Sequence, residues 1–109
     1  MIKVTIYRKD NKIIAFEITG HAGSGPYGHD LVCAAVSAVS FGAVNAVIKL
    51  CDIEPNIKQN DDGGYLYVTL PFHLEKDIKD RASLLLEGML VSLQTIEREY
   101  QSFIHINEN

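Results

Sequence analysis

A histidine and a cysteine twelve residues apart are the side chains best suited to chemistry in this 109-residue chain: His21 and Cys33. Between them, residues 20–28 are too rich in glycine and proline for a regular element, which predicts a loop. An uncharged run follows and predicts a helix from Leu31 to about Leu50, with Asp30 as its N-cap. Cys33 is then expected within the first helical turn.

A cysteine in the first turn of a helix is well placed for nucleophilic catalysis. The unpaired N–H groups and the helix dipole favour an anion there, and the thiolate is the reactive form of cysteine. The same N–H groups, that of Cys33 included, can stabilise the oxyanion of an attacked carbonyl. His21, at the end of a predicted strand, can take the thiol proton and return it to the leaving amine. The pattern indicates a cysteine protease with Cys33 as nucleophile and His21 as proton-transfer partner.

The loop and the residue before the helix have supporting roles in this hypothesis. We expect the loop to be a lid that orders over a bound peptide. Asp30 either caps the helix or orients His21, although its carboxylate also opposes a thiolate at Cys33. The residues expected in the substrate loop are Gly23, Gly25, Tyr27, Gly28 and His29.

Several less specific interpretations stay open for these side chains. Cys33 taken alone is typical of a small core residue, and His21 alone is typical of a surface histidine. A glycine-rich loop before a helix can hold phosphate, but here no lysine follows the glycines. A mixed zinc site is another alternative, with the ligands His21, His29, Asp30 and Cys33. The other cysteine, Cys51, is expected to be structural, and the other histidines, His73 and His105, are expected on the surface.

Composition restricts the class of partner and the compartment. The formal net charge of −4 argues against direct binding to a nucleic-acid backbone, which needs a basic surface. Residues 31–48 carry no charge and reach the length of a membrane helix, but Ser37, Gly42 and Asn45 favour a buried core helix. Cys33 and Cys51, on one helix, are about 27 Å apart and cannot pair. Free thiols and the lack of a signal peptide predict a cytoplasmic protein with no membrane partner.

Hydrophobic periodicity predicts the elements that hold the site. Alternating residues over 2–7 and 14–18, around turn residues 8–11, predict a β-hairpin with one buried face. Segments 53–58 and 65–70 predict two more strands, joined by the turn Asp61-Asp62-Gly63-Gly64.

The last third of the chain completes the expected fold. From about Glu75 to Tyr100, apolar residues recur every three or four positions and predict a second helix. Residues 102–106 predict a possible short edge strand. The order ββαββα indicates a single domain over residues 1–109, a two-layer α+β fold with two helices on one face of a mostly antiparallel sheet. Leu84, Leu85 and Leu86 form a wider apolar surface than one core face needs and hint at a helical dimer interface, with completion of the core as the alternative for Leu86.

Two stretches of the chain resemble a known family. Gly20-His21-Ala22 and the run from Gly28-His29-Asp30 through Cys33 to Ser37 resemble the signature of the bacterial ribosomal-processing cysteine proteases. Asp62-Gly63-Gly64 and residues 89–94 are similar to that family too. The resemblance implies a catalytic pair of His21 and Cys33 and no metal or organic cofactor.

The same resemblance implies a substrate and an assembly. Members remove a short N-terminal extension from a large-subunit ribosomal protein, cutting after an aromatic residue and before a small one, and they dimerise through their helices. The expected partners are therefore a leader peptide and a second copy of the chain. The rival hypotheses are a non-catalytic ribosome-assembly or peptide-binding module and, third, a metal-dependent hydrolase.

Overall fold

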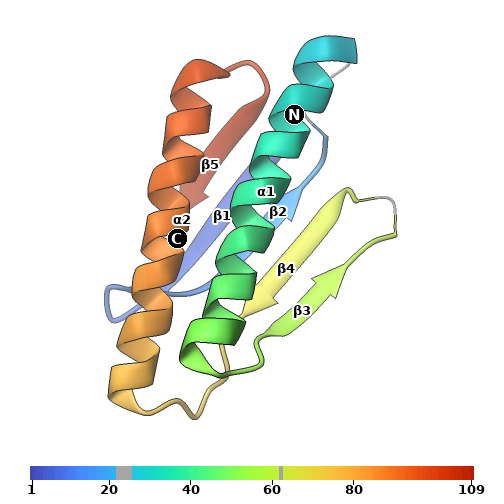
Figure 1. Ribbon diagram of the computed structural model, residues 1–109. Coiled ribbons are helices and arrows are strands. Elements are labelled where there is room, and N and C mark those ends of the chain that lie inside the picture. The colour runs from blue at the N-terminus through green and yellow to red at the C-terminus, as the bar shows by residue number, and fades with distance from the viewer. Residues whose placement is uncertain (22–25, 62) are drawn as a thin grey trace.

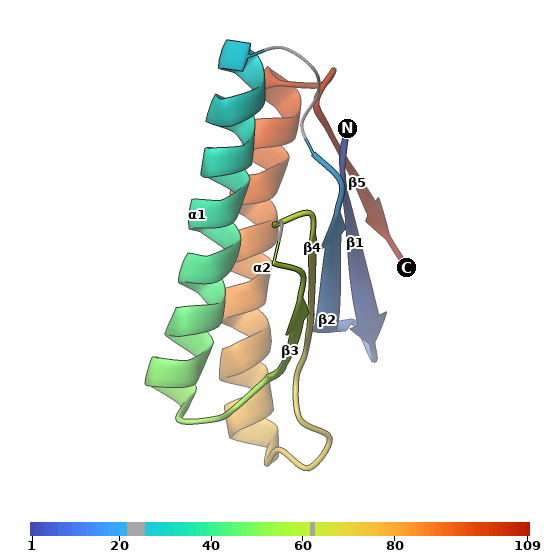
Figure 2. The same ribbon diagram turned by 90° about the vertical axis from the view of Figure 1, so that its right-hand side faces the viewer.

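The structure is a computed structural model that describes residues 1–21, 26–61 and 63–109, with the backbone alone for residues 26–30. The described residues form seven elements: β1 (Ile2–Lys9), β2 (Lys12–Thr19), α1 (Pro26–Cys51), β3 (Asn56–Gln59), β4 (Tyr65–Thr69), α2 (Lys76–Glu99) and β5 (Ile104–Glu108). Figure 1 shows both helices in front of the sheet, and the turned view in Figure 2 separates the two layers. The predicted two-layer α+β fold is confirmed.

The sheet has the strand order β3-β4-β2-β1-β5. Pairing is antiparallel between β1 and β2, β2 and β4, and β3 and β4, and it is parallel between β1 and β5. At the turn between β1 and β2, Asp10 and Asn11 both have positive φ, as a two-residue type I′ hairpin requires. Strand β3 begins later than residue 53, because Pro55 has no N–H to donate to a neighbouring strand.

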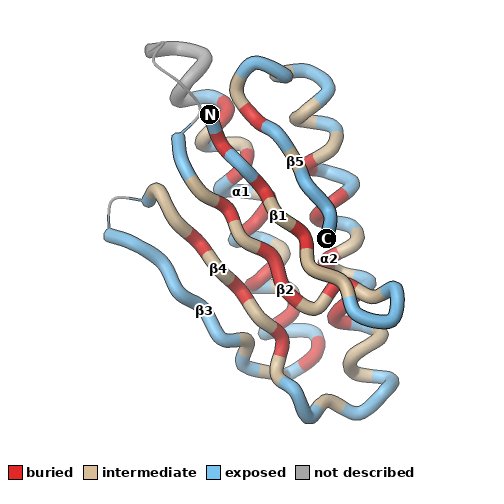
Figure 3. Tube along the Cα trace, turned by 180° about the vertical axis from the view of Figure 1, so that it is seen from behind, coloured by how far each residue is buried: buried red, intermediate tan, exposed pale blue. Residues whose placement is uncertain are grey.

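The apolar face of the sheet packs under the two helices, which run antiparallel to each other (Figure 1). Seen from behind, the strands alternate between buried and more exposed residues, as expected for a sheet covered on one side (Figure 3). Val4, Ile6 and Phe16 are fully buried, and from the helices Val47 and Leu93 close over them. Cys51 belongs to this core too, as the sequence suggested.

The start of α1 differs from the prediction. The helix begins at Pro26 rather than after Asp30, so the predicted loop of residues 20–28 is shorter than expected. Proline is favoured at the first helical position, where its missing N–H costs nothing and its φ suits the helix. Asp30 therefore lies inside the helix and is not its N-cap, and Cys33 is its eighth residue rather than a member of its first turn.

The first helix, α1, is less buried than the core helix that the sequence predicted. Within α1, the stretch Leu31–Cys51 has the length and hydropathy of a membrane span, yet only 28% of it is buried. Its buried residues recur at helical spacing on one face, which packs on the sheet and on α2. A two-layer domain covers a helix from below and from one side, so the outer face of α1 stays apolar and exposed, with Leu31 and Leu50 among its residues.

Candidate active site

His21 and Cys33 line one pocket at the end of the sheet where β2 stops. This pocket has a volume of about 280 Å³, and Ile2, Gly20 and Gly63 are among its other lining residues. The two candidate catalytic side chains thus come from different layers, His21 from the sheet and Cys33 from α1. Nucleophilic catalysis by cysteine requires an imidazole close to the thiol, and a shared pocket is the first condition for that arrangement.

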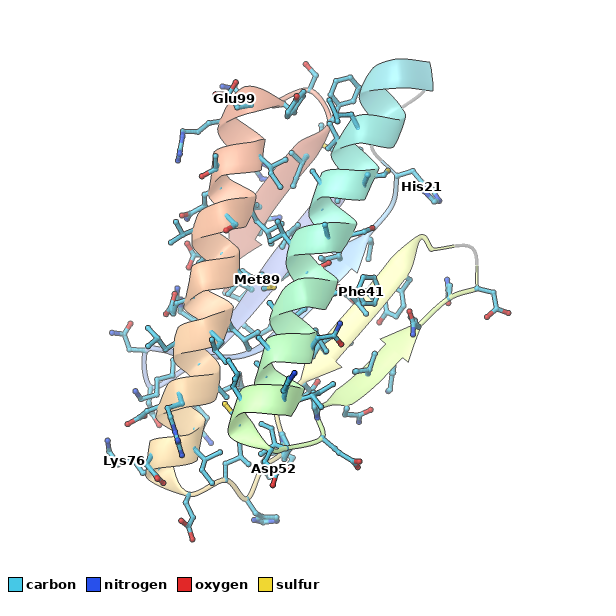
Figure 4. The ribbon with its side chains drawn as sticks, viewed as in Figure 1. His21, Phe41, Asp52, Lys76, Met89 and Glu99 are labelled. Atoms are coloured by element: carbon cyan, nitrogen blue, oxygen red, sulfur yellow. The ribbon has the colours of Figure 1, made fainter. Side chains whose placement is uncertain are left out.

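His21 is held by the backbone just before it. Gly20 has φ of +87°, and a Cβ there would collide with the carbonyl oxygen of Met1, so only glycine fits. The Gly20 N–H donates a hydrogen bond to the Gly64 carbonyl oxygen at 2.9 Å, which ties the end of β2 to the β3–β4 turn. His21 is exposed, and in Figure 4 it lies level with the N-terminal half of α1 with its side chain directed away from that helix.

Cys33 faces the sheet side of α1. It is partly buried, has a free thiol and packs against the hydrophobic core, next to the fully buried Val32. Its position beyond the first turn has a chemical consequence: an N–H group inside a helix is already used by the carbonyl four residues earlier. In this conformation the Cys33 N–H is thus not available to an oxyanion, and Cys33 does not lie at the helix start on which the sequence prediction of an activated nucleophile rested.

The structure describes only some of the residues predicted to form the substrate loop, and those it describes are helical. Gly23 and Gly25 lie outside the described residues. Tyr27, Gly28 and His29 belong to the first turns of α1, but of their side chains, as of that of Asp30, nothing is described. Within the part of the chain that the structure describes, no three His, Cys, Asp or Glu side chains gather as metal ligands would.

The other cysteine and the other two described histidines lie where the sequence predicted them, in the core and on the surface respectively. Cys51 is buried at the far end of α1, and His73 and His105 are exposed. His105 has its Nδ1 atom 3.7 Å from a Glu97 carboxylate oxygen, at the other side of the molecule from β3.

Sequence reasoning gave no site role to five other described residues that line the pocket: Ile2, Ile18, Val36, Ser37 and Gly63. Val36 and Ser37 follow Cys33 by about one helical turn, so their place on the same face could have been found from helical spacing. Ile18 comes from β2, two residues before Gly20, and is one of the apolar residues that alternate along that strand. Gly63 reaches the pocket only through the pairing of β4 with β2, a tertiary contact that no local pattern indicates.

An α+β domain in which a partly exposed cysteine and a histidine share a pocket has the layout of a thiol hydrolase. The comparison with known proteins is more specific: the model of the family described as cysteine protease Prp matches residues 1–105. The chain belongs to this family and is therefore a cysteine protease.

Relatives with known names match almost from end to end. The ribosomal processing cysteine protease Prp of Bacillus subtilis (strain 168) is 50% identical over 110 residues, which cover 100% of this chain and 98% of the relative. The protein of the same name from Staphylococcus aureus (strain Mu50) is 46% identical, with 98% of each chain covered.

Solved structures share the fold. A crystal structure of the S. aureus ribosomal processing protease Prp with a covalently linked product peptide is 44% identical, has a TM-score of 0.87 and aligns over 100% of both chains. A second, with a substrate peptide, has a TM-score of 0.85 at the same identity and coverage. A Streptococcus mutans protein is 35% identical with a TM-score of 0.88, covering 99% of this chain and 93% of its own.

Proposed function

We propose that Cys33 and His21 are the catalytic dyad of this cysteine protease and that its substrate is the N-terminal leader of a ribosomal protein. The observation that carries the dyad is that both side chains line a single pocket in a chain of this family. The only other cysteine, Cys51, is buried in the core at the opposite end of α1 and lies outside that pocket.

The reaction follows from the two side chains. The Cys33 thiol gives its proton to His21 and its sulfur attacks the carbonyl carbon of the scissile bond. The tetrahedral intermediate collapses to a thioester as the protonated His21 gives that proton to the leaving amine, which departs. A water molecule, deprotonated by His21, then attacks the thioester, and the released Cys33 sulfur regains the proton.

The leader peptide is proposed from the relatives. Those from B. subtilis and S. aureus are named ribosomal processing proteases, and one S. aureus structure holds a substrate peptide. A short extension on a large-subunit ribosomal protein, cut after an aromatic residue and before a small one, is the substrate that this likeness supports. Free thiols at both cysteines support action in the cytoplasm, where reduced cysteines persist.

We also infer that the protein works as a homodimer that pairs through its helices. Two large apolar side chains of α2, Leu84 and Val91, are 70% and 61% exposed and lie seven residues apart on one face. On α1, Leu31, Ile48 and Leu50 are exposed as well. Apolar side chains gathered on one side of a small domain mark an interaction surface.

The test of the dyad is cleavage of a leader peptide by the wild type and by Cys33→Ala, His21→Ala and Cys51→Ala. We expect no cleavage by Cys33→Ala, a loss of about a hundredfold or more for His21→Ala, and cleavage by folded Cys51→Ala. Full-rate cleavage by the Cys33 variant would end the proposal. A peptide that binds the wild type without being cut would favour the rival, a non-catalytic peptide-binding module.

A further inference from the structure

A second pocket continues the first along α1. It has a volume of about 90 Å³ and shares four lining residues with the pocket of His21 and Cys33: Ile18, Val36, Ser37 and Gly63. Two hollows with so many residues in common are parts of one groove. We name this second hollow the Phe41 pocket, because Phe41 lines it and not the first.

The groove runs between α1 and the β3–β4 hairpin. Along α1 its wall is made by Cys33, Ser37 and Phe41, which are four residues apart and so lie on nearly the same face. Across from them lie Gln59 of β3 and Leu66 of β4, which are paired with each other in the sheet. Figure 4 shows Phe41 on the side of α1 that lies over β4.

The Phe41 pocket is mainly apolar. Ile18, Val36, Phe41 and Leu66 supply hydrocarbon surface, Ser37, Gln59 and Tyr65 add neutral polar groups, and none of the described residues that line it carries a formal charge. The hydroxyl of Ser40, also in the lining, already donates to the Val36 carbonyl oxygen at 2.8 Å. A charged side chain would lose hydration there without gaining an oppositely charged partner from the lining, whereas an apolar one would be stabilised.

The remaining exposure of Phe41 also points to an occupant. Its side chain is 40% exposed, although the residues beside it in the pocket, Val36, Ser40 and Leu66, are buried. A ligand side chain in the pocket would cover this ring and remove apolar surface from water.

Distance along the helix relates the pocket to the scissile bond. Eight residues of α-helix separate Phe41 from Cys33, which is about 12 Å. An extended peptide covers about 3.3 Å per residue. A peptide in the groove would thus place a side chain about three or four residues from the attacked carbonyl into the Phe41 pocket.

We propose that the Phe41 pocket is a specificity subsite of the protease, which selects an apolar side chain about three or four residues from the scissile bond. This inference rests on the proposed cleavage by Cys33 and His21. Phe41 is then a residue that determines specificity through binding and takes no part in the proton transfers.

The experiment combines an alanine scan of the leader peptide with the variant Phe41→Ala. Cleavage of each peptide is measured for both enzymes as kcat and KM. One apolar position of the peptide should lose roughly tenfold in kcat/KM with the wild type, the usual scale for a truncated side chain in an apolar pocket. With Phe41→Ala, the same peptide change should lower kcat/KM much less. The enzyme variant has already lost the contact that the peptide change removes, so the two effects are not additive.

The control is Phe72→Ala, the same truncation at a residue that is 93% exposed and lies outside both pockets. It should leave the alanine-scan profile as it is in the wild type. A loss of dimerisation or of folded protein in Phe41→Ala would lower cleavage of all peptides alike and would not change the profile.

The outcomes separate the subsite from the activity itself. If Phe41→Ala leaves the profile of the scan unchanged while Cys33→Ala abolishes cleavage, the subsite is refuted and the dyad stands. If neither the wild type nor any variant cuts a leader peptide, the proposed function fails, and the subsite with it. A position-specific change, seen mainly in KM, supports the subsite.

Discussion

The backbone N–H of Gly20 donates a hydrogen bond to the carbonyl oxygen of Gly64 at 2.9 Å, one residue before His21 and one residue after Gly63. This bond extends the pairing of β2 with β4 past its last paired residues, Thr19 and Tyr65. Because His21 and Gly63 both line the pocket that also contains Cys33, the bond fixes two sides of this pocket relative to each other.

Replacement of Gly20 by alanine is expected to lower both stability and activity. Its φ of +87° is unfavourable for a residue with a Cβ, and that Cβ would also collide with the Met1 carbonyl. We expect Gly20→Ala to lower the free energy of unfolding by about 1–3 kcal/mol, the range for a residue forced into such a conformation. Chemical denaturation measures this loss, and cleavage by the folded fraction measures the displacement of His21.

Gly63→Ala is the matched control, because Gly63 also has positive φ (79°) but nothing lies within 4 Å of the Cβ position. It should lose less stability than Gly20→Ala, since it suffers the strain of the backbone without the collision. Equal losses for the two variants would show that the contact with Met1 does not restrict the position of Gly20.

The two thiols are expected to react with alkylating reagents at different rates in the native protein. Cys33 is partly exposed at a pocket, whereas Cys51 is 7% exposed in the core. Iodoacetamide at neutral pH should therefore modify Cys33 first, and loss of cleavage should follow its modification and not that of Cys51. Mass spectrometry of peptides taken at intervals checks this. Faster loss of the Cys51 thiol would contradict the assignment of the nucleophile.

The strands and the second helix could be predicted because their signals are local. The alternation in β1 and β2 and the three- and four-residue spacing in α2 come directly from burial of one face, and the structure has these elements within a few residues of the expected bounds. The first residue of α1 could not be predicted from such local patterns. Asp30 is a good N-cap in isolation, but Pro26 is also a good first residue of a helix, and the helix uses the earlier start.

The pair of candidate catalytic residues could be inferred from sequence, but the rest of the pocket could not. His21 and Cys33 have side chains with distinctive chemistry, and a short connection limits how far apart they can lie. Phe41 and Gly63 have no such signature. Their place depends on how the β3–β4 hairpin packs beside α1, which is a property of the whole fold.

Acid is expected to weaken the protein through Asp80. Its carboxylate lies 2.7 Å from the Lys12 ammonium of β2 and 2.8 Å from that of Lys76. The adjacent ammonium groups, that of Lys12 first and then that of Lys76, lower the pKa of Asp80 from 3.8 to about 2. A carboxylate whose pKa is lower in the folded than in the unfolded protein stabilises the fold at pH values above the unfolded-state pKa. This stabilisation is lost as the pH falls through the folded-state pKa. This contribution should thus disappear between pH 3.8 and about 2.

The measurement is urea denaturation of the wild type and Asp80→Asn from pH 6 to pH 2. The wild type should be the more stable at pH 6, and the difference should shrink as the pH approaches 2. Asp77→Asn is the control, because Asp77 and its partner Arg81 are both largely exposed and 3.5 Å apart. A difference between wild type and Asp80→Asn that stays constant down to pH 2 would contradict the linkage.

Charge on the outer face of α2 is expected to separate the proposed dimer. Leu84 is 70% exposed and has no role in the core of the single chain, so Leu84→Glu should fold normally. In a helix-mediated dimer the same change would place a carboxylate among apolar side chains without a partner, which is strongly unfavourable. Sedimentation equilibrium should therefore find the wild type as a dimer and Leu84→Glu as a monomer. Phe72→Glu, a substitution at a loop residue that is 93% exposed, should remain dimeric, and a monomeric wild type at micromolar concentration would refute the dimer.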